Sequence, residues 1–248
     1  MSNTTTTDKR TAGDPTDPGI LATAALAVEL VSDGARVGLG SGRASSAFIA
    51  ALGARMRRGL SIVGVPTSEA SAKQARLLGI PLVDIEEDVP LDITVDGADE
   101  VAPNLDLVKG RGAAFVRERI VAAASRRQVI LVGPEKIVPA LCARGDGFPV
   151  EIFPLARGLA MRRLKALGLR PVQREDGRGG PFVSDNGNLI FECGVAAPLA
   201  DGAAARAVEA AVRAIPGVID TGLFLGTAER VLVGHPDGKV DVLTRAET

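Results

Sequence analysis

The sequence lacks tryptophan and tyrosine, and aromatic residues make up only 3% of its 248 residues. Stacking platforms for nucleic-acid bases and the aromatic belts of membrane proteins both depend on such side chains. No uninterrupted apolar run approaches the roughly 20 residues of a membrane-spanning helix. A net charge of −1, from 29 basic and 30 acidic residues, gives no electrostatic attraction to nucleic acid or to an anionic membrane. We therefore expect neither nucleic acid nor membrane as a partner.

Metal-binding and nucleophilic side chains are also scarce. The chain has one histidine, His235, and two cysteines, Cys142 and Cys193. Two cysteines make no disulfide framework, and buried reduced thiols are the interpretation we favour. One histidine in a polar turn excludes a His-based zinc site, and the absence of a GxSxG motif argues against a Ser-His-Asp hydrolase. The sequence therefore predicts no metal site and no cofactor.

The N-terminal segment, residues 1–19, is rich in Thr, Asp, Pro and Gly. It lacks the apolar stretch of a secretory signal, so we predict a disordered lead-in and a cytoplasmic location. The rest of the chain has the composition of a globular protein of one or two domains, with 46% hydrophobic and 24% charged residues overall.

Short apolar segments alternate with helical patterns from residue 20 to about residue 134. The expected helices span residues 20–31, 45–56, 68–78 and 112–125, with Gly79 just past the end of the third. The expected strands lie within 35–42, 61–66, 81–85, 91–100 and 127–134. Apolar strands that alternate with helices predict an α/β fold with an open, mostly parallel, Rossmann-like sheet covered by helices on both faces.

The order of elements changes after residue 146. Strand and helix patterns follow one another as strand, helix, strand, strand, helix, strand, over residues 149–155, 156–168, 169–175, 188–195, 201–215 and 217–224. This is the split βαβ order of a ferredoxin-like α+β domain. A last hairpin over residues 230–243 is expected to rejoin the first sheet. We therefore predict a Rossmann-like domain made of residues 20–146 and 223–248, with a ferredoxin-like domain, residues 147–222, inserted in it.

The first candidate site is the glycine-rich turn GLGSGRA, residues 38–44. Such a turn lets backbone N–H groups approach an anion at a helix N-terminus. It is not a dinucleotide fingerprint, because the third glycine would fall at Arg43 and the second strand ends without a ribose-binding carboxylate. It is not a P-loop either, since no GK[ST] follows. A plain tight turn remains the alternative.

The second candidate is the acidic turn that follows a buried strand, with Asp96, Asp99 and Glu100 inside five residues. Carboxylates this close repel one another and lose hydration, unless solvent, a cation or a substrate interacts with them. A solvated acidic turn, a metal site and a substrate site are all consistent with the pattern. The scarcity of histidine and the nearby Lys109 argue against the metal.

The third candidate is the KGRG loop at residues 109–112 with the helix behind it. A lysine and free N–H groups at a helix entry could jointly hold an oxyanion. Glu118 lies on a helix face with Ala114 and Val121, and a carboxylate on an apolar face can have a raised pKa and act as a general base. The alternative is a surface glutamate paired with Arg117 or Arg119.

Several motifs in the same order carry a resemblance to a known family. DGADE, KGRGAAFVRERI and SDNGN occur together with GLGSG, GVPTS, LVGPEKIV, PVEIFPLA, AIPGVIDTGLF and GHPDG. From about residue 20 to 243 the chain resembles the type A ribose-5-phosphate isomerases. The resemblance implies a metal-free aldose–ketose isomerase of the non-oxidative pentose phosphate pathway, which interconverts ribose 5-phosphate and ribulose 5-phosphate through an enediolate. Its partners would be a small sugar phosphate and further copies of the chain, as a homodimer or homotetramer.

The resemblance also implies roles for individual residues. Glu118 would move the proton between C1 and C2, and Lys109 would stabilise the enediolate. Asp96 and Asp99 would take part in ring opening and hold sugar hydroxyls. The substrate-binding set would comprise Ser41, Gly42, Arg43, Ala44, Gly97, Ala98, Gly110, Arg111, Gly112 and Lys136.

The chain departs from the family pattern where the phosphate is expected. Two hydroxyl positions of the family's first loop are Arg43 and Ala44 here, and a lysine of the first helix is Ile20. The family's KGGG loop carries Arg111. Either Arg43 or Arg111 replaces the lost donors, because arginine binds phosphate in a bidentate way, or the substrate is a different pentose derivative. A non-catalytic sugar-phosphate sensor is a further alternative, which the intact catalytic set disfavours.

Overall fold

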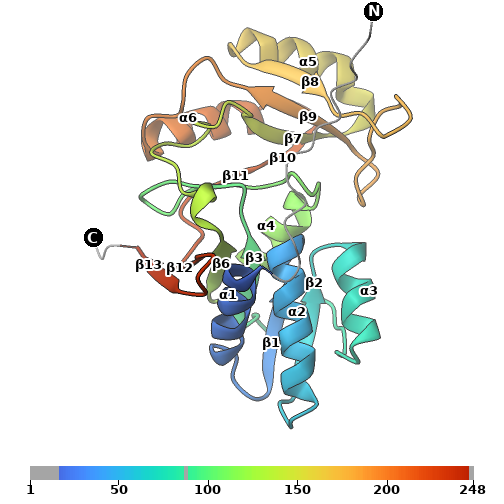
Figure 1. Ribbon diagram of the computed structural model, residues 1–248. Coiled ribbons are helices and arrows are strands. Elements are labelled where there is room, and N and C mark those ends of the chain that lie inside the picture. Colours follow the sequence, from blue (N-terminus) through green and yellow to red (C-terminus); the bar gives the residue numbers. More distant parts are fainter. Residues whose placement is uncertain (1–16, 87–88, 246–248) are drawn as a thin grey trace, which may run out of the picture.

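The computed structural model describes residues 17–86 and 89–245 (Figure 1). The predicted lead-in lies outside the described residues up to residue 16, and its predicted end at residue 19 is wrong, because helix α1 spans Pro18–Glu29. Asp17 caps this helix by accepting hydrogen bonds from the N–H groups of Gly19 and Ile20, at 2.8 and 3.2 Å. A proline at the first helical position needs no such partner, which explains the early start.

A six-stranded sheet forms the larger part of the fold, in the order β13-β12-β6-β3-β1-β2. Its strands are β1 (Ala35–Leu39), β2 (Ile62–Pro66), β3 (Ile93–Gly97), β6 (Gln128–Val132), β12 (Arg230–Gly234) and β13 (Val240–Thr244). All neighbours are parallel except β12 and β13, which form an antiparallel hairpin. The prediction of a mostly parallel sheet that the last hairpin rejoins is confirmed.

Helices cover both faces of this sheet. Buried residues of α1 and α2 (Arg43–Met56) pack against apolar side chains of β1, β3 and β6. Helix α4 (Phe115–Ala123) lies on the opposite face, where Val121 packs against Val65 and Leu91. Helix α3 (Glu69–Leu77) packs against β2 and α2. Side chains alternate across a strand, so Asp96 of β3 points to the α4 face while Val95 points to the other.

The second sheet is antiparallel and has the order β10-β7-β9-β8. Its strands are β7 (Phe148–Ile152), β8 (Arg170–Gln173), β9 (Leu189–Gly194) and β10 (Val218–Thr221), with α5 (Arg157–Ala166) after β7 and α6 (Gly202–Arg213) after β9. This is the predicted ferredoxin-like arrangement, which lies at the top of Figure 1. Alternate residues of β7 and β9 form its core with α5 and α6. The exact domain boundaries stay a proposal.

A third, three-stranded sheet was not predicted. It has the order β11-β5-β4, from β4 (Glu100–Val101), β5 (Leu107–Val108) and β11 (Leu223–Phe224). The expectation of one strand over residues 217–224 is therefore wrong, because the chain leaves the second sheet at Gly222 and enters the third. The carbonyl of Gly222 accepts the N–H of Lys109 at 2.8 Å, and a Cβ at this glycine would lie 2.1 Å from the Lys109 carbonyl oxygen.

One other predicted strand, over residues 81–85, is also wrong. Within the described residues this segment forms an isolated bridge between Leu82 and Gly64 instead of a strand. Pro81 has no N–H to donate, so a regular ladder at this edge would lack a hydrogen bond at its start.

Both cysteines are free and buried, and burial raises the pKa of Cys142 to about 12. Among the described helices, none has the length and apolar character needed to cross a membrane.

Candidate active site

A cleft of about 420 Å³ opens at the carboxyl ends of the parallel strands, where ligands of open α/β sheets bind. Nearly all residues predicted for the site line it. From that set the lining contains Ser41, Gly42, Arg43, Ala44, Gly97, Ala98, Asp99, Lys109, Gly110, Arg111, Gly112, Glu118 and Lys136. Asp96 is the exception, because it lies beneath the lining at 2% exposure. The fold therefore brings together three loops that are far apart in the sequence.

Asp96 is held by groups from three segments. Its Oδ1 accepts hydrogen bonds from the N–H of Ser41 and the hydroxyl of Ser45, both at 3.0 Å, and from the N–H of Gly97 at 2.8 Å. Its Oδ2 forms an ion pair with Lys109 Nζ at 3.0 Å. A Cβ at Gly40 would lie 2.3 Å from Oδ1, so the glycine turn has to be bare where it passes this carboxylate. Asp96 thus joins the first loop to the lysine.

Lys109 lies directly after β5, with its side chain 3% exposed. Its Nζ contacts Asp96, lies 3.2 Å from Oε2 of Glu118, and donates a hydrogen bond to the carbonyl of Gly97. Burial alone would lower the pKa of Lys109, but the two carboxylates outweigh burial and raise it above its ordinary value. The lysine is therefore charged, and its ammonium group contacts two buried carboxyl groups at once.

Glu118 is buried on helix α4, with its side chain 6% exposed. Burial, followed by repulsion from Asp96, raises its pKa to about 8, although Lys109 acts in the opposite direction. The two neighbouring arginines pair elsewhere, Arg117 with Glu69 at 3.0 Å and Arg119 with Asp220 at 2.5 Å. Glu118 is therefore no surface glutamate paired with its neighbours. Its carboxyl group faces the cleft with a pKa suited to accepting and returning a proton near neutral pH.

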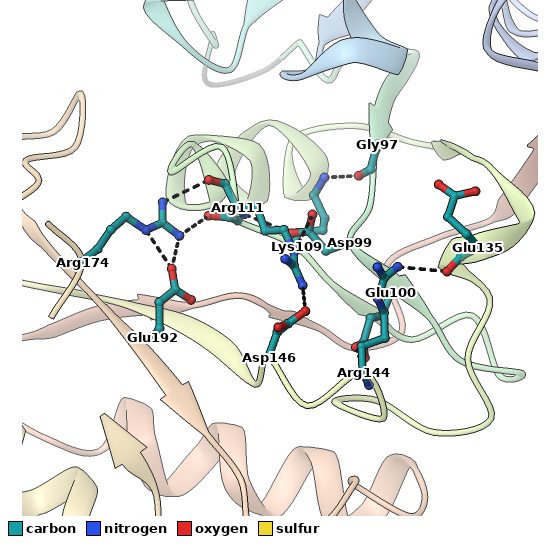
Figure 2. A network of polar contacts seen from close by, with 11 residues as sticks. Gly97, Asp99, Glu100, Lys109, Arg111, Glu135, Arg144, Asp146, Arg174 and Glu192 are labelled. Atoms are coloured by element: carbon teal, nitrogen blue, oxygen red, sulfur yellow. Dashed lines mark hydrogen bonds and ion pairs between the residues drawn. The ribbon is translucent and has the colours of Figure 1, made fainter. Parts of the chain in front are cut away.

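Asp99 and Arg111 also line the cleft, and Figure 2 shows them in the polar network around Lys109. Oδ2 of Asp99 accepts the backbone N–H of Arg111 at 3.0 Å, and Oδ1 lies 3.6 Å from Nε of the same arginine. The guanidinium of Arg111 also pairs with Asp146. Arg111 is thus engaged by two carboxylates, which leaves Arg43 as the arginine of the cleft whose role is open.

The glycine turn and the start of α2 form the end of the cleft predicted to bind phosphate. Gly42 has φ 87° and precedes Arg43, the first residue of α2, whose side chain is exposed. The Ser41 hydroxyl contacts the hydroxyls of Thr67 and Ser68, at 2.8 and 2.7 Å. Ile20, at the position of the family's lysine, lines the same cleft.

Lys136 lies in a 3₁₀ turn after β6, Pro134–Lys136. Burial lowers its pKa below the ordinary value, although Asp99 acts in the opposite direction. It lines the cleft on the side of Gly133 and Glu135. The structure therefore supplies a second ammonium group in the cleft besides Lys109.

The carboxylates of the acidic turn do not converge on one point. Glu100 is 1% exposed and turns away from Asp99, since it accepts the backbone N–H groups of Cys142 and Arg144 at 2.5 and 3.2 Å. Over residues 17–86 and 89–245 there is no group of three His, Cys, Asp or Glu side chains arranged to hold a metal ion.

Other residues at the site escaped the sequence analysis. Asp17, Thr23, Glu135 and Pro236 line the cleft, and Arg174 contacts the KGRG loop from the second sheet. Asp17 belongs to the predicted lead-in. Its position directly before Pro18, which is typical of a helix N-cap, is the sequence signal that could have identified it. Arg174 carries no local signal of a role at the site, because the loop carbonyls that it contacts lie more than sixty residues away in the sequence.

A buried carboxyl group, an ammonium group and a glycine-rich loop at the carboxyl edge of an α/β sheet define a site for acid–base chemistry on a small polar ligand. The family model described as ribose 5-phosphate isomerase A (phosphoriboisomerase A) matches residues 63–238. The ribose-5-phosphate isomerase A of Roseiflexus castenholzii is 44% identical over 218 residues, which cover 87% of this chain and 91% of the relative. The chain belongs to the ribose 5-phosphate isomerase A family.

Solved structures agree with this assignment. The ribose 5-phosphate isomerase A of Methanocaldococcus jannaschii superimposes with a TM-score of 0.84 at 37% identity, covering 91% of this chain and 97% of the other. A D-ribose-5-phosphate isomerase in complex with phospho-erythronic acid has a TM-score of 0.84 at 35% identity, covering 91% and 98%. The predicted fold class is therefore confirmed.

Proposed function

We propose that the protein interconverts ribose 5-phosphate and ribulose 5-phosphate, and that Glu118 is its general base. The observation that carries the proposal is the buried row Asp96–Lys109–Glu118, with Lys109 and Glu118 lining the cleft. Family membership supports the substrate, as does the phospho-erythronic acid complex of a related isomerase.

The reaction needs one base that reaches two adjacent carbons. In the open-chain aldose, Glu118 removes the proton on C2, the C1–C2 double bond forms, and the charge moves to the carbonyl oxygen. Lys109 and the N–H groups of the glycine loop stabilise that oxygen in the enediolate. Glu118 then returns its proton to C1, while the O2 proton is transferred to O1 and C2 becomes the carbonyl carbon. Protons and electrons balance within the sugar and Glu118, so these steps require no oxidant and no metal.

The two aspartates have different places in this scheme. Asp99 lines the cleft, so we assign it to the sugar hydroxyls and to ring opening. Asp96 is covered and fully engaged by Ser41, Ser45, Gly97 and Lys109. We therefore assign it to holding Lys109 and the first loop in place.

An isomerisation assay over phosphorylated and free pentoses tests the proposal directly. We expect the largest kcat/KM for ribose 5-phosphate, unchanged after dialysis against EDTA. Loss of activity on chelation with recovery on Mg²⁺ would contradict the metal-free scheme.

The altered loop at Arg43 and Ala44 favours one second candidate, an isomerase of a different pentose derivative. Inactivity on ribose 5-phosphate together with turnover of another sugar in the panel would establish that candidate.

Arg43 is the candidate phosphate ligand of the cleft. A guanidinium at the start of α2 adds charge-assisted donors to the free N–H groups of the helix. We expect Arg43→Ala to raise KM for ribose 5-phosphate by about 10-fold or more, and to leave the weak turnover of free ribose nearly unchanged. Arg57→Ala, which removes an exposed arginine at the other end of the same helix, is the matched control. Equal effects on both sugars would remove Arg43 from the phosphate site.

The pKa of Glu118 predicts a pH profile. Below its pKa the carboxyl group is protonated and accepts no proton, so activity should rise as Glu118 ionises. The pH dependence of kcat/KM reports the pKa values of the free enzyme. The half-maximal point on the acid side of this profile should therefore lie near pH 8, well above the ordinary glutamate pKa of 4.5. Initial rates from about pH 5 to pH 10 test this. A profile that is already flat above pH 6 would contradict a raised pKa at this carboxyl group.

We also propose that the protein is cytoplasmic and forms a homodimer or homotetramer. The exposed apolar side chains Phe153 and Leu155, at 51% and 89% exposure, support association between copies. Sedimentation velocity at micromolar concentration measures the oligomeric state, and a single monomer species would contradict this proposal.

A further inference from the structure

Arg174 reaches from the ferredoxin-like domain to the loop that carries Lys109 (Figure 2). It lies just after β8, and its guanidinium donates hydrogen bonds to two consecutive backbone carbonyls of the loop. One bond goes to Gly110 and one to Arg111, both at 3.1 Å. The side chain of Arg174 is only 17% exposed.

The orientation of this guanidinium is itself determined by its neighbours. Nε donates to Oε1 of Glu192 on β9 at 2.7 Å, and a terminal nitrogen pairs with the same oxygen. The guanidinium carbon lies 5.6 Å from the centre of the Phe182 ring. A planar guanidinium has five N–H donors, and two of them are directed at Glu192. The other three keep defined directions, and two of these bind the loop carbonyls. Arg174 is therefore a rigid fork that contacts the loop.

Arg174 binds the carbonyl oxygens of two peptide groups, so the N–H groups of these two peptides point away from Arg174 and toward the site. In a trans peptide the C=O and N–H bonds point in opposite directions. The Gly110 carbonyl points to Arg174, and the N–H of the same peptide, on Arg111, donates to Asp99 at 3.0 Å. The Arg111 carbonyl also points to Arg174, so the N–H of Gly112 is directed away from the arginine. Gly112 lines the cleft.

The backbone of the loop needs such external support. The N–H of Ala113 donates to the Gly110 carbonyl at 3.0 Å, which closes a tight turn over residues 110–113. Gly110 has φ 112° and Ala113 has φ 62°, a region that residues with a Cβ seldom adopt. At Ala113 this conformation is strained, and it persists only where surrounding contacts determine it. The bonds from Arg174 are such contacts.

We propose that Arg174 is a positioning residue of the isomerase, which orients the peptide groups of the KGRG loop so that the N–H of Gly112 and the Asp99 carboxylate face the reacting oxygens. Glu192 and Phe182 fix the guanidinium for this task. This inference rests on the proposed function, because it assigns the N–H of Gly112 to the enediolate. It makes a residue of the ferredoxin-like domain part of the machinery that the other domain carries.

The test compares Arg174→Ala with Arg170→Ala. Arg170 is an exposed arginine of the same strand region that also donates to a carbonyl, that of Val195, at 2.5 Å. For Arg174→Ala we expect kcat to fall by about 10-fold while KM changes by less than about 3-fold, because the lost orientation acts on the transition state. Affinity for phospho-erythronic acid, whose carboxylate resembles the enediolate in charge and shape, should fall by a similar factor. Inhibition by inorganic phosphate should stay unchanged.

Hydrogen exchange gives a readout that does not depend on turnover. The amides of Arg111 and Ala113 should exchange at least about 10-fold faster in Arg174→Ala than in the unmodified protein, while the amides of β3 keep their rates. Arg174→Lys should restore part of kcat, because an ammonium can reach one carbonyl but does not form the fork. If Arg174→Ala does not fold, Arg174→Lys and Glu192→Gln supply the same comparison.

Defined results would overturn the proposal. They are a kcat of Arg174→Ala within about twofold of the unmodified protein, an equal loss in Arg170→Ala, or loop amides with unchanged exchange. Failure of the proposed function appears differently, as an unmodified protein that does not isomerise ribose 5-phosphate. In that case faster exchange of the loop amides in Arg174→Ala would still support the positioning role, and unchanged exchange would reject it.

Discussion

Replacing Glu118 by glutamine should lower kcat for ribose 5-phosphate by about 100-fold or more, with a much smaller change in KM. Glutamine keeps the shape of the side chain and its place beside Lys109 in the lining of the cleft, but it cannot take the proton from C2. The substitution also removes one of the two carboxyl groups that contact Lys109, while the other, on Asp96, remains. Single-turnover measurements of the isomerisation and of deuterium loss from C2 would locate the defect in the proton transfer.

Glu69→Gln is the matched control. Glu69 pairs with Arg117, the residue before Glu118, at 3.0 Å, so its loss perturbs the same helix from the solvent side. We expect its kcat to lie within about twofold of the unmodified protein, as surface ion pairs contribute little. A folded Glu118→Gln protein with full activity would reject Glu118 as the base, whereas equal losses in both variants would indicate a disturbed helix.

The sequence was sufficient for the fold class because its signals are local. The period of two in the strands and of 3.6 in the helices reflects which faces are buried, and the order of elements then restricts the topology. The strand prediction over residues 217–224 was wrong because contacts with residues distant in the sequence decide where that strand ends. The segment 217–224 has a continuous strand pattern, but Gly222 is fitted between Pro149 and Lys109, and the chain changes sheets there.

The candidate site was predictable in part for the same reason. The apolar face of Glu118 indicated a raised pKa from residues three and four positions away, and the structure places this carboxyl group in a buried row with Lys109 and Asp96. The sequence did not indicate that Asp96 lies beneath the cleft, since that depends on Ser41, Ser45 and Lys109 meeting around it. Nor did it indicate Arg174, whose carbonyl partners belong to the other domain.

Replacing Lys109 by methionine should affect both activity and stability, because one ammonium group serves two buried carboxylates. Methionine fills a similar volume and carries no charge, so Asp96 and Glu118 would remain buried with no cation between them. Removing one partner from a buried ion pair costs about 3–5 kcal/mol of unfolding free energy. The enediolate would lose its nearest cation as well, which should lower kcat by about 100-fold or more.

The stability loss in Lys109→Met should depend on pH in a defined direction. Without the lysine, which lowers the pKa of Glu118, that pKa in the folded protein rises further above its value in the unfolded chain. A carboxyl group with a raised folded pKa leaves stability intact at low pH and reduces it as the pH rises through that pKa. The difference from the unmodified protein in urea unfolding should therefore be larger at pH 8 than at pH 5. Lys239→Met, which removes an exposed lysine, should show no such difference. A deficit that is equal at both pH values would mean that the cost comes from packing, and that Lys109 does not stabilise the ionised form of Glu118.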